Sequence, residues 1–166
     1  SDSDIMSSFS SWGIPGSLKL KPEITAPGGN IYSVDGQTPG GQSYENMSGT
    51  SMAAPQVAGM VALAAEYIRE NNLAEQTGLT PRQLAQSLLM STAVPLREEA
   101  AGGNYWSILK QGAGLANIGA AISSNIYIKM DDSATVSASD GKVKAELGDD
   151  PQRTGSYRVS FALHNL

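Results

Sequence analysis

The longest apolar segment of the chain predicts a central helix. Residues from Val57 to Ala65 are apolar throughout, interrupted only by Gly59, so no polar face recurs at the helical period. A helix without a polar face is expected to be buried on all sides. Polar residues return at Glu66 and Arg69, which indicates that the far end of this helix reaches solvent.

A second helix is predicted by its start signals between residues 79 and 84. Thr80 and Gln83 have the spacing of a capping box, and Pro81 stands at the first helical position, where a missing N–H costs little. The apolar positions that follow predict a buried stripe: Leu84, Leu88 and Leu89. We expect this helix to be structural. A further short helix is expected around Asn117–Ser123.

Short strands are expected on both sides of the helical part. Turn residues bracket the segments Glu23–Ala26 and Ile31–Val34. Near the end, residues 157–164 alternate between apolar and polar, which predicts a half-buried antiparallel strand. Its apolar side consists of Tyr157, Val159, Phe161 and Leu163. Three more strands are predicted after residue 125: Ile126–Met130, Ala134–Ala138 and Lys142–Leu147.

Composition restricts the kind of protein. The chain has 166 residues, a formal net charge of −5 and no cysteine. This length allows one domain with a sizeable core. The acidic charge, with no run of lysine or arginine, argues against nucleic acid and anionic membranes as partners. The lack of cysteine excludes disulfides and thiolate zinc sites, and no apolar run has the length of a membrane span.

The candidate chemistry lies where a small polar loop becomes the central helix. Ser51 stands at this junction after Gly49 and Thr50, and Pro55 is expected in the first turn. The first N–H groups of a helix have no helical partner, and the macrodipole adds positive charge there, so they can stabilise an oxyanion. Thr50 is the expected N-cap, and Gly49 lets a substrate backbone approach closely.

Four motifs resemble those of the subtilisin-like serine proteases, the subtilases, and occur in the same order. Residues 49–59, GTSMAAPQVAG, resemble the nucleophile motif. Residues 7–13 and 21–28 resemble upstream motifs, and residues 112–117, GAGLAN, resemble the closing segment. The resemblance implies that Ser51 is the catalytic serine. It implies supporting roles in the nucleophile loop for Gly49, Thr50 and Met52, with Met52 as a wall of the leaving-group side.

The resemblance also divides the chain into two incomplete parts. Residues 1–123 are expected to form the C-terminal part of a doubly wound, subtilisin-like α/β catalytic domain. Residues 124–166 resemble the first strands of the fibronectin-like β-sandwich that follows this domain in cell-envelope subtilases, the lactocepin-type and complement-degrading peptidases. Protein or peptide substrates and an extracellular or cell-wall location are implied by the same resemblance.

The serine lacks its usual partners. A nucleophilic serine needs a base and usually a carboxylate that orients the base. Subtilases place both before the serine, in the order Asp, His, Ser, but no histidine precedes Ser51, and the single histidine is His164. We therefore expect a fragment that is inactive alone and needs the missing N-terminal part of its catalytic domain, which also carries the oxyanion asparagine. Exposed strand edges are expected to allow self-association.

Three alternatives remain open at this point. The order Ser, Asp, His occurs in α/β-hydrolases, and an esterase of that type would bring His164 within hydrogen-bond distance of Ser51. Its carboxylate would come from Asp131, Asp140 or Asp149. Residues 48–51 would instead serve as an anion-binding nest in a non-enzymatic protein. A non-catalytic surface interaction module built on residues 124–166 would pack the serine away from solvent.

No cofactor is expected from the sequence, and no metal site is evident. The pairs Asp131–Asp132 and Asp149–Asp150 are candidates for calcium, which remains possible in the parent protein, but no loop with spaced oxygen ligands surrounds them. Two positions depart from the subtilase pattern. Gln56 replaces the histidine of many relatives, and Ser48 replaces an asparagine, which leaves the hydrogen bonding of that side chain open.

Overall fold

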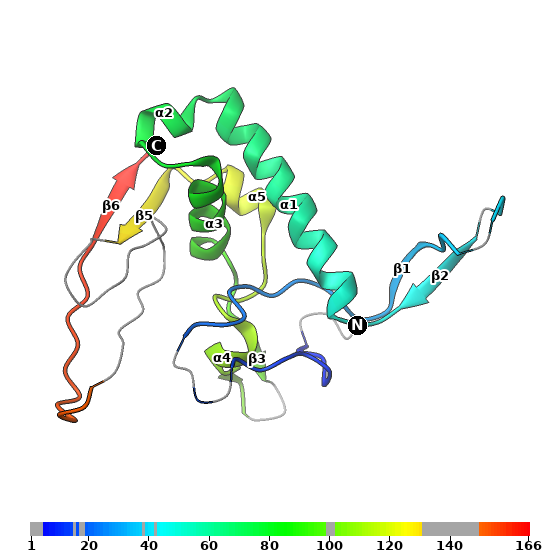
Figure 1. Cartoon of the computed structure of the whole chain (residues 1–166), viewed down its shortest axis with the longest axis horizontal. Coiled ribbons are helices and arrows are strands. Elements are labelled where there is room, and N and C mark those ends of the chain that lie inside the picture. The colour runs from blue at the N-terminus through cyan, green and yellow to red at the C-terminus, as the bar shows by residue number, and fades with distance from the viewer. Residues whose placement is uncertain are drawn as a thin grey trace.

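In the computed structural model, one long helix joins a helical body at one end to a projecting hairpin at the other (Figure 1). The structure describes residues 5–14, 16, 19–37, 39–41, 43–98, 102–130 and 150–166. The elements, in chain order, are β1 (Ile31–Val34), β2 (Tyr44–Met47), α1 (Thr50–Glu70), α2 (Leu73–Thr77), α3 (Pro81–Ser91), β3 (Arg97–Glu98), β4 (Asn104–Tyr105), α4 (Ile108–Gln111), α5 (Ile118–Ile122), β5 (Ile126–Met130) and β6 (Phe161–Asn165).

The core lies between the second half of α1 and the elements that follow it. Ala64 and Ile68 of α1 are fully buried, as are Leu84 and Leu88 of α3. Helix α1 packs against α3 and α5, and β5 adds Tyr127 to the same cluster. Burial of these apolar side chains is the main term that holds the helices together.

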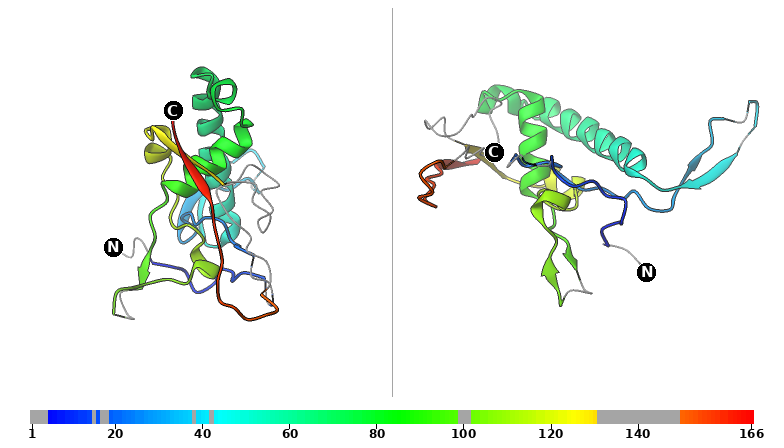
Figure 2. Two further views of the ribbon diagram at one scale, coloured as in Figure 1. Left: turned by 90° about the vertical axis from the view of Figure 1, so that its left-hand side faces the viewer. Right: turned by 60° about the horizontal axis from the view of Figure 1, so that its bottom comes forward.

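The prediction that residues 57–65 of α1 are buried on all sides is wrong. Only Ala64 and Ile68 are buried in this helix, whereas Val61 and Leu63 are 37% and 52% exposed. In the described part of the chain, the elements that pack on α1 are α2, α3 and α5, and its buried residues lie in its second half. An apolar face of this helix, the long diagonal one in the right-hand view of Figure 2, therefore remains in solvent.

Helix α3 begins as its sequence predicts. The Gln83 amide nitrogen donates to Thr80 Oγ1 over 3.3 Å, and the Thr80 amide nitrogen donates to Gln83 Oε1 over 2.8 Å. Pro81 occupies the first turn, and the predicted stripe is buried: Leu84, Leu88 and Leu89. The short helix predicted near residue 118 is also present as α5, where the Asn117 side chain accepts from the Ala120 amide nitrogen.

Two motifs that are far apart in the sequence meet in the structure. The Thr25 amide donates to the Gly114 carbonyl oxygen, and the Ala116 amide donates to the Thr25 carbonyl oxygen, both over 2.8 Å. Leu115 pairs with Val94 on its other side. A Cβ on Gly114 would lie 2.4 Å from the Val94 carbonyl oxygen, so this crossing requires glycine.

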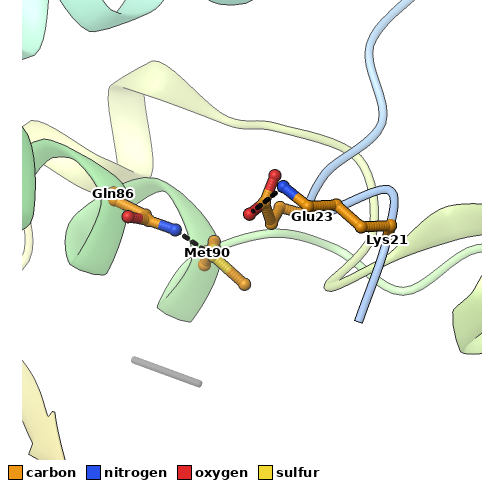
Figure 3. Close-up of polar contacts among 4 residues, drawn as sticks. All are labelled: Lys21, Glu23, Gln86 and Met90. Carbon is orange, nitrogen blue, oxygen red and sulfur yellow. Dashed lines mark hydrogen bonds and ion pairs between the residues drawn. The ribbon is translucent and has the colours of Figure 1, made fainter. Parts of the chain in front are cut away.

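A surface ion pair lies beside this crossing. Lys21 Nζ and Glu23 Oε1 are 2.6 Å apart, and the Glu23 carbonyl oxygen accepts from the Ala113 amide nitrogen (Figure 3). The same figure shows Gln86 Nε2 donating to the sulfur of Met90 over 3.8 Å within α3. Because both partners of the ion pair are partly exposed, it contributes little to stability.

The doubly wound sheet implied by the sequence is represented only in part. In the described residues, the three sheets each have two antiparallel strands, and the single parallel pairing is the bridge between Thr25 and Leu115. The segment 97–111 contains the short pair β3 and β4 and the helix α4. The structure thus mixes helices with small sheets.

The last strands form an antiparallel pair that packs on α3. The predicted strand Ile126–Met130 is confirmed as β5, and β6 runs from Phe161 to Asn165. Ser87 Oγ of α3 donates to the Ile128 carbonyl oxygen over 3.2 Å. The predictions for residues 134–138 and 142–147 lie outside the described residues. In the described residues this region forms one two-stranded sheet, which does not confirm the predicted start of a β-sandwich.

The predicted inner face of β6 is reversed. Phe161 and Leu163 were expected to be buried but are 55% and 65% exposed. The reason is the register, in which Tyr127 pairs with His164. Tyr127 is buried in the helical core, so the side of the sheet that carries His164 faces inward.

Candidate functional site

The candidate nucleophile lies at the first turn of α1. Ser51 is the second residue of the helix and is exposed. The prediction that Thr50 is the N-cap is wrong, because Gly49 occupies that position and Thr50 is already helical. Gly49 has no side chain, so no side-chain oxygen satisfies the first N–H groups. These groups retain the positive end of the helix dipole next to Ser51.

Pro55 is the sixth residue of α1 and not part of its first turn, contrary to the sequence prediction. Its ring nitrogen carries no hydrogen, so the Ser51 carbonyl oxygen cannot receive the usual bond from the residue four positions later. At the start of the helix, the Met52 amide nitrogen donates to the Gly49 carbonyl oxygen over 3.1 Å. The start of α1 is therefore shaped by Gly49 and Pro55 together.

The loop before Ser51 is held by the segment that precedes β1. The Gly49 amide donates to the Gly28 carbonyl oxygen over 2.7 Å, and the Asn30 amide donates to Ser48 Oγ over 2.8 Å. Ser48 thus makes a hydrogen bond although it departs from the subtilase pattern. These two bonds tie the two segments together on either side of the same turn.

Gln56 links the first helical turns to the same segment. Its Nε2 atom donates to the Pro27 carbonyl oxygen over 2.9 Å and lies 3.4 Å from the Met52 carbonyl oxygen. From the sequence, Gln56 is only a departure from the subtilase pattern. The structure gives it a positioning role, because it joins the helix that carries Ser51 to the backbone of residues 27–30.

A cavity of about 360 Å³ opens beside Ser51. One wall is the β1–β2 hairpin and the other is the start of α1. The residues that line it are Ile31, Ser33, Val34, Glu45, Met47, Ser51, Met52, Pro55 and Gln56. The sequence predicted β1 but missed β2, although a Gly-containing loop between two short segments is a hairpin signal. It therefore missed Glu45 and Met47.

A larger hollow of about 730 Å³ lies beside Gly49 and Thr50. It is bounded by residues 5–11, 22–30 and the buried side chain of Lys110, whose Nζ atom lies 4.4 Å from the centre of the Trp106 ring. Gly49 and Thr50 thus line one hollow, and Ser51 and Met52 line the other. The four residues singled out in the sequence lie between these two hollows.

The structure does not bring His164 to Ser51. His164 lies on β6, where its ring stacks on Tyr127 with 4.9 Å between ring centres. Figure 1 shows β6 beside β5 on the left, well separated from the start of α1, which lies next to β1 and β2. The α/β-hydrolase arrangement is therefore not formed. The three carboxylates that were candidates for that arrangement lie outside the described residues: Asp131, Asp140 and Asp149.

The other aspartates near turns have structural partners. Asp35 accepts from the Gln37 amide nitrogen over 2.8 Å and from Ser43 Oγ over 3.0 Å, which closes the tip of the β1–β2 hairpin. Asp150 accepts from the Gly155 amide nitrogen over 2.7 Å, and this bond, with others from Thr154 and Arg153, lowers its pKa.

Two further observations concern the described residues alone. They contain no group of three or more histidine, cysteine, aspartate or glutamate side chains placed to hold a metal ion. Within the same residues, no helix is both long enough and apolar enough to cross a bilayer.

The chain is similar to known proteins over most of its length. A profile described as the subtilase family matches residues 1–143. The PII-type proteinase of Lactococcus lactis subsp. cremoris is 34% identical over 164 residues, which is 95% of this chain and 8% of that protein. The C5a peptidase of Streptococcus pyogenes is 35% identical over 160 residues, 96% of this chain and 12% of that protein. The chain therefore spans about a tenth of the length of these relatives.

Two solved structures are also similar. The PatG macrocyclase domain is 28% identical, with a TM-score of 0.46 over 69% of this chain and 30% of that one. The patellamide maturation protease PatA is 32% identical, with a TM-score of 0.41 over 60% of this chain and 32% of that one.

Proposed function

Because the chain belongs to the subtilase family, we propose that it carries the nucleophile of a serine endopeptidase, with Ser51 as the catalytic serine. The observation that supports this best is the position of Ser51. It is exposed, it lies in the first turn of α1, and it lines a cavity between the helix and the β1–β2 hairpin. A peptide can reach this oxygen from solvent.

In the proposed reaction, Ser51 Oγ attacks the carbonyl carbon of the peptide bond and forms an acyl-enzyme, which water then hydrolyses. The proton of Ser51 passes to a base and then to the departing amine. The carbonyl oxygen gains negative charge beside the N-terminal N–H groups of α1, which include that of Ser51. Gly49, Thr50 and Met52 shape the loop around these groups.

The base is proposed to come from a part of the protein other than this chain. His164 is the single histidine in the sequence, and its ring is stacked on Tyr127 far from the start of α1. We infer that an additional part of the catalytic domain supplies the histidine, the orienting aspartate and an asparagine for the oxyanion. The chain alone would then be inactive.

The exposed face of α1 fits this proposal. Val61 and Leu63 are apolar but exposed, although the sequence around them is that of a buried helix. The same additional part of the domain would cover this face and so complete both the core and the active site. The free edges of β1 and β2 offer a second contact, either to that part or to another copy of this chain.

The remaining features extend the proposal to the whole protein. Residues 1–123 would form the rear of the doubly wound catalytic domain, and residues 124–166 would open a fibronectin-like sandwich. The resemblance to cell-envelope subtilases leads us to propose a secreted or wall-associated location, and the similarity to a proteinase and a peptidase leads us to propose proteins or peptides as substrates. No cofactor is proposed, and any calcium would bind elsewhere in the parent protein.

Covalent labelling with a fluorophosphonate probe tests the proposal. The probe should label Ser51 in a longer polypeptide that contains the aspartate and histidine, and should scarcely label this chain alone. Ser51→Ala should abolish labelling, whereas Ser91→Ala, which removes a serine of α3 far from the cavity, should not. Equal labelling of the isolated chain would contradict the proposed need for a second part.

A further inference from the structure

The β1–β2 hairpin has two chemically different faces. Its register pairs Ile31 with Met47 and Ser33 with Glu45, so these four side chains share one face. All four line the cavity beside Ser51. On the other face, the rings of Tyr32 and Tyr44 stack with 5.5 Å between their centres. The hairpin therefore contributes Glu45, and not a tyrosine, to the cavity that Ser51 also lines.

Glu45 is the single ionisable side chain among the residues that line this cavity. The other lining residues are either apolar or neutral: Ile31, Val34, Met47, Met52 and Pro55, and Ser33, Ser51 and Gln56. The Gln56 amide is already bound to the Pro27 carbonyl oxygen. Neither the ion pair Lys21–Glu23 nor the ion pair Glu66–Arg69 involves Glu45.

This combination fits one class of side chain. Lysine and arginine have apolar stems that pack along apolar walls while the cationic head stays near water or a carboxylate. Met47, Met52 and Ile31 offer such walls, and Glu45 is exposed beside them. The net charge of −5 also favours the approach of cationic peptides.

We propose that this cavity holds a lysine or arginine side chain of the peptide substrate, adjacent to the cleaved bond, and that Glu45 selects it by charge. The proposal rests on the proposed function of Ser51, because it assigns the substrate class of the same site. Glu45 is then a specificity-determining residue that contacts substrate. It takes no part in bond cleavage.

The test uses the full-length protease that carries this chain and pairs of peptides that differ at one position. Each pair tests one position near the cleaved bond. One peptide has lysine at that position, and the other has norleucine, which keeps the apolar stem and lacks the charge. Because Glu45 is exposed, we expect a preference for lysine of about twofold to fivefold in kcat/KM at one position. The preference should shrink in high salt.

Three variants make the test specific. Glu45→Gln should lower kcat/KM for the lysine peptide to that for its norleucine partner, and an unchanged thermal denaturation midpoint would show that the variant is folded. Glu45→Lys should lower kcat/KM for the lysine peptide below that for its norleucine partner. Glu75→Gln removes an equally exposed carboxylate on α2, distant from the cavity, and should keep the lysine preference.

The outcomes separate the two proposals. If norleucine and lysine peptides are cleaved at equal rates, or if Glu45→Gln keeps the preference, the role of Glu45 is overturned while the serine endopeptidase stands. If no peptide is cleaved and the fluorophosphonate probe leaves Ser51 unlabelled, the proposed function fails, and the role of Glu45 fails with it.

Discussion

Gly28 and Gly49 touch through their backbones at the base of the candidate nucleophile loop. The Gly49 amide donates to the Gly28 carbonyl oxygen over 2.7 Å, and a Cβ on Gly28 would lie 2.7 Å from the Gly49 carbonyl oxygen. The same Cβ would lie 3.4 Å from the Cβ of Ala53 in α1. Gly28 thus fixes how closely the loop and the helix that carries Ser51 can approach the preceding segment.

Gly28→Ala should therefore destabilise the fold and displace the loop. The added methyl group meets backbone, which cannot move aside cheaply, so we expect a loss of about 1–3 kcal/mol in the free energy of unfolding. Urea denaturation of the chain measures this loss. Gly36→Ala is the matched control, because a Cβ there meets nothing within 4 Å, and it should change stability by less than about 0.5 kcal/mol. Equal effects of the two substitutions would contradict the close contact.

Two threonines at helix starts should respond differently to substitution. Thr80 caps α3 with its side chain, so Thr80→Ala should cost about 1 kcal/mol of stability. Thr50 is already inside α1 and has no capping role, so Thr50→Ala should cost less than about 0.5 kcal/mol. Thermal or urea denaturation of both variants gives the comparison. A larger loss at Thr50 would show that its hydroxyl, and not Gly49, organises the start of α1.

These two helix starts also show what local sequence signals can and cannot predict. The capping box of α3 and the strand Ile126–Met130 follow the sequence closely, since both depend on residues within a few positions of each other. At α1, the same reasoning chose Thr50 over Gly49 as the cap. Both residue types are favourable at an N-cap. The hydrogen bond from Gly49 to Gly28, a contact between residues distant in sequence, fixes Gly49 at this position.

The sequence predicted only part of the candidate site. Ser51 and its neighbours follow from a contiguous motif, whereas Glu45 and Met47 enter the site only because β2 pairs with β1. The exposed face of α1 and the reversed face of β6 share a cause. The apolar pattern of a sequence shows which side chains favour burial, but burial also requires another element that packs on them. Within the described residues, other elements cover only part of α1 and only one side of β6.

Gln111 should be sensitive to loss of its amide. It is 2% exposed, its Oε1 atom accepts from the Leu96 amide nitrogen over 2.7 Å, and its Nε2 atom donates to the Trp106 carbonyl oxygen over 2.7 Å. Gln111→Leu fills the space but leaves both backbone groups without partners, so we expect a loss of about 1–3 kcal/mol for each buried group. Gln76→Leu changes an exposed amide in α2 and should stay within about 0.5 kcal/mol in the same urea titration.

Tyr127 should make stability depend on pH in the alkaline range. Burial raises the pKa of this phenol above its ordinary value of 10.0. Above pH 10 the unfolded chain therefore releases the proton more readily than the folded chain does. The contribution of this phenol to the free energy of unfolding is fully present below pH 10. It is lost as the pH rises through the higher pKa of the folded state.

Tyr127→Phe removes the titrating group and keeps the ring that packs on α3 and on His164. The variant should lose less stability than the parent chain between pH 9 and 11.5, as measured by urea denaturation at a series of pH values. Tyr44→Phe is the control, because Tyr44 is 56% exposed on the hairpin, and it should leave the alkaline decline unchanged. If Tyr127→Phe and the parent chain decline in parallel, the phenol already titrates in solvent, and the packing of β5 on the helical core must be looser than the structure indicates.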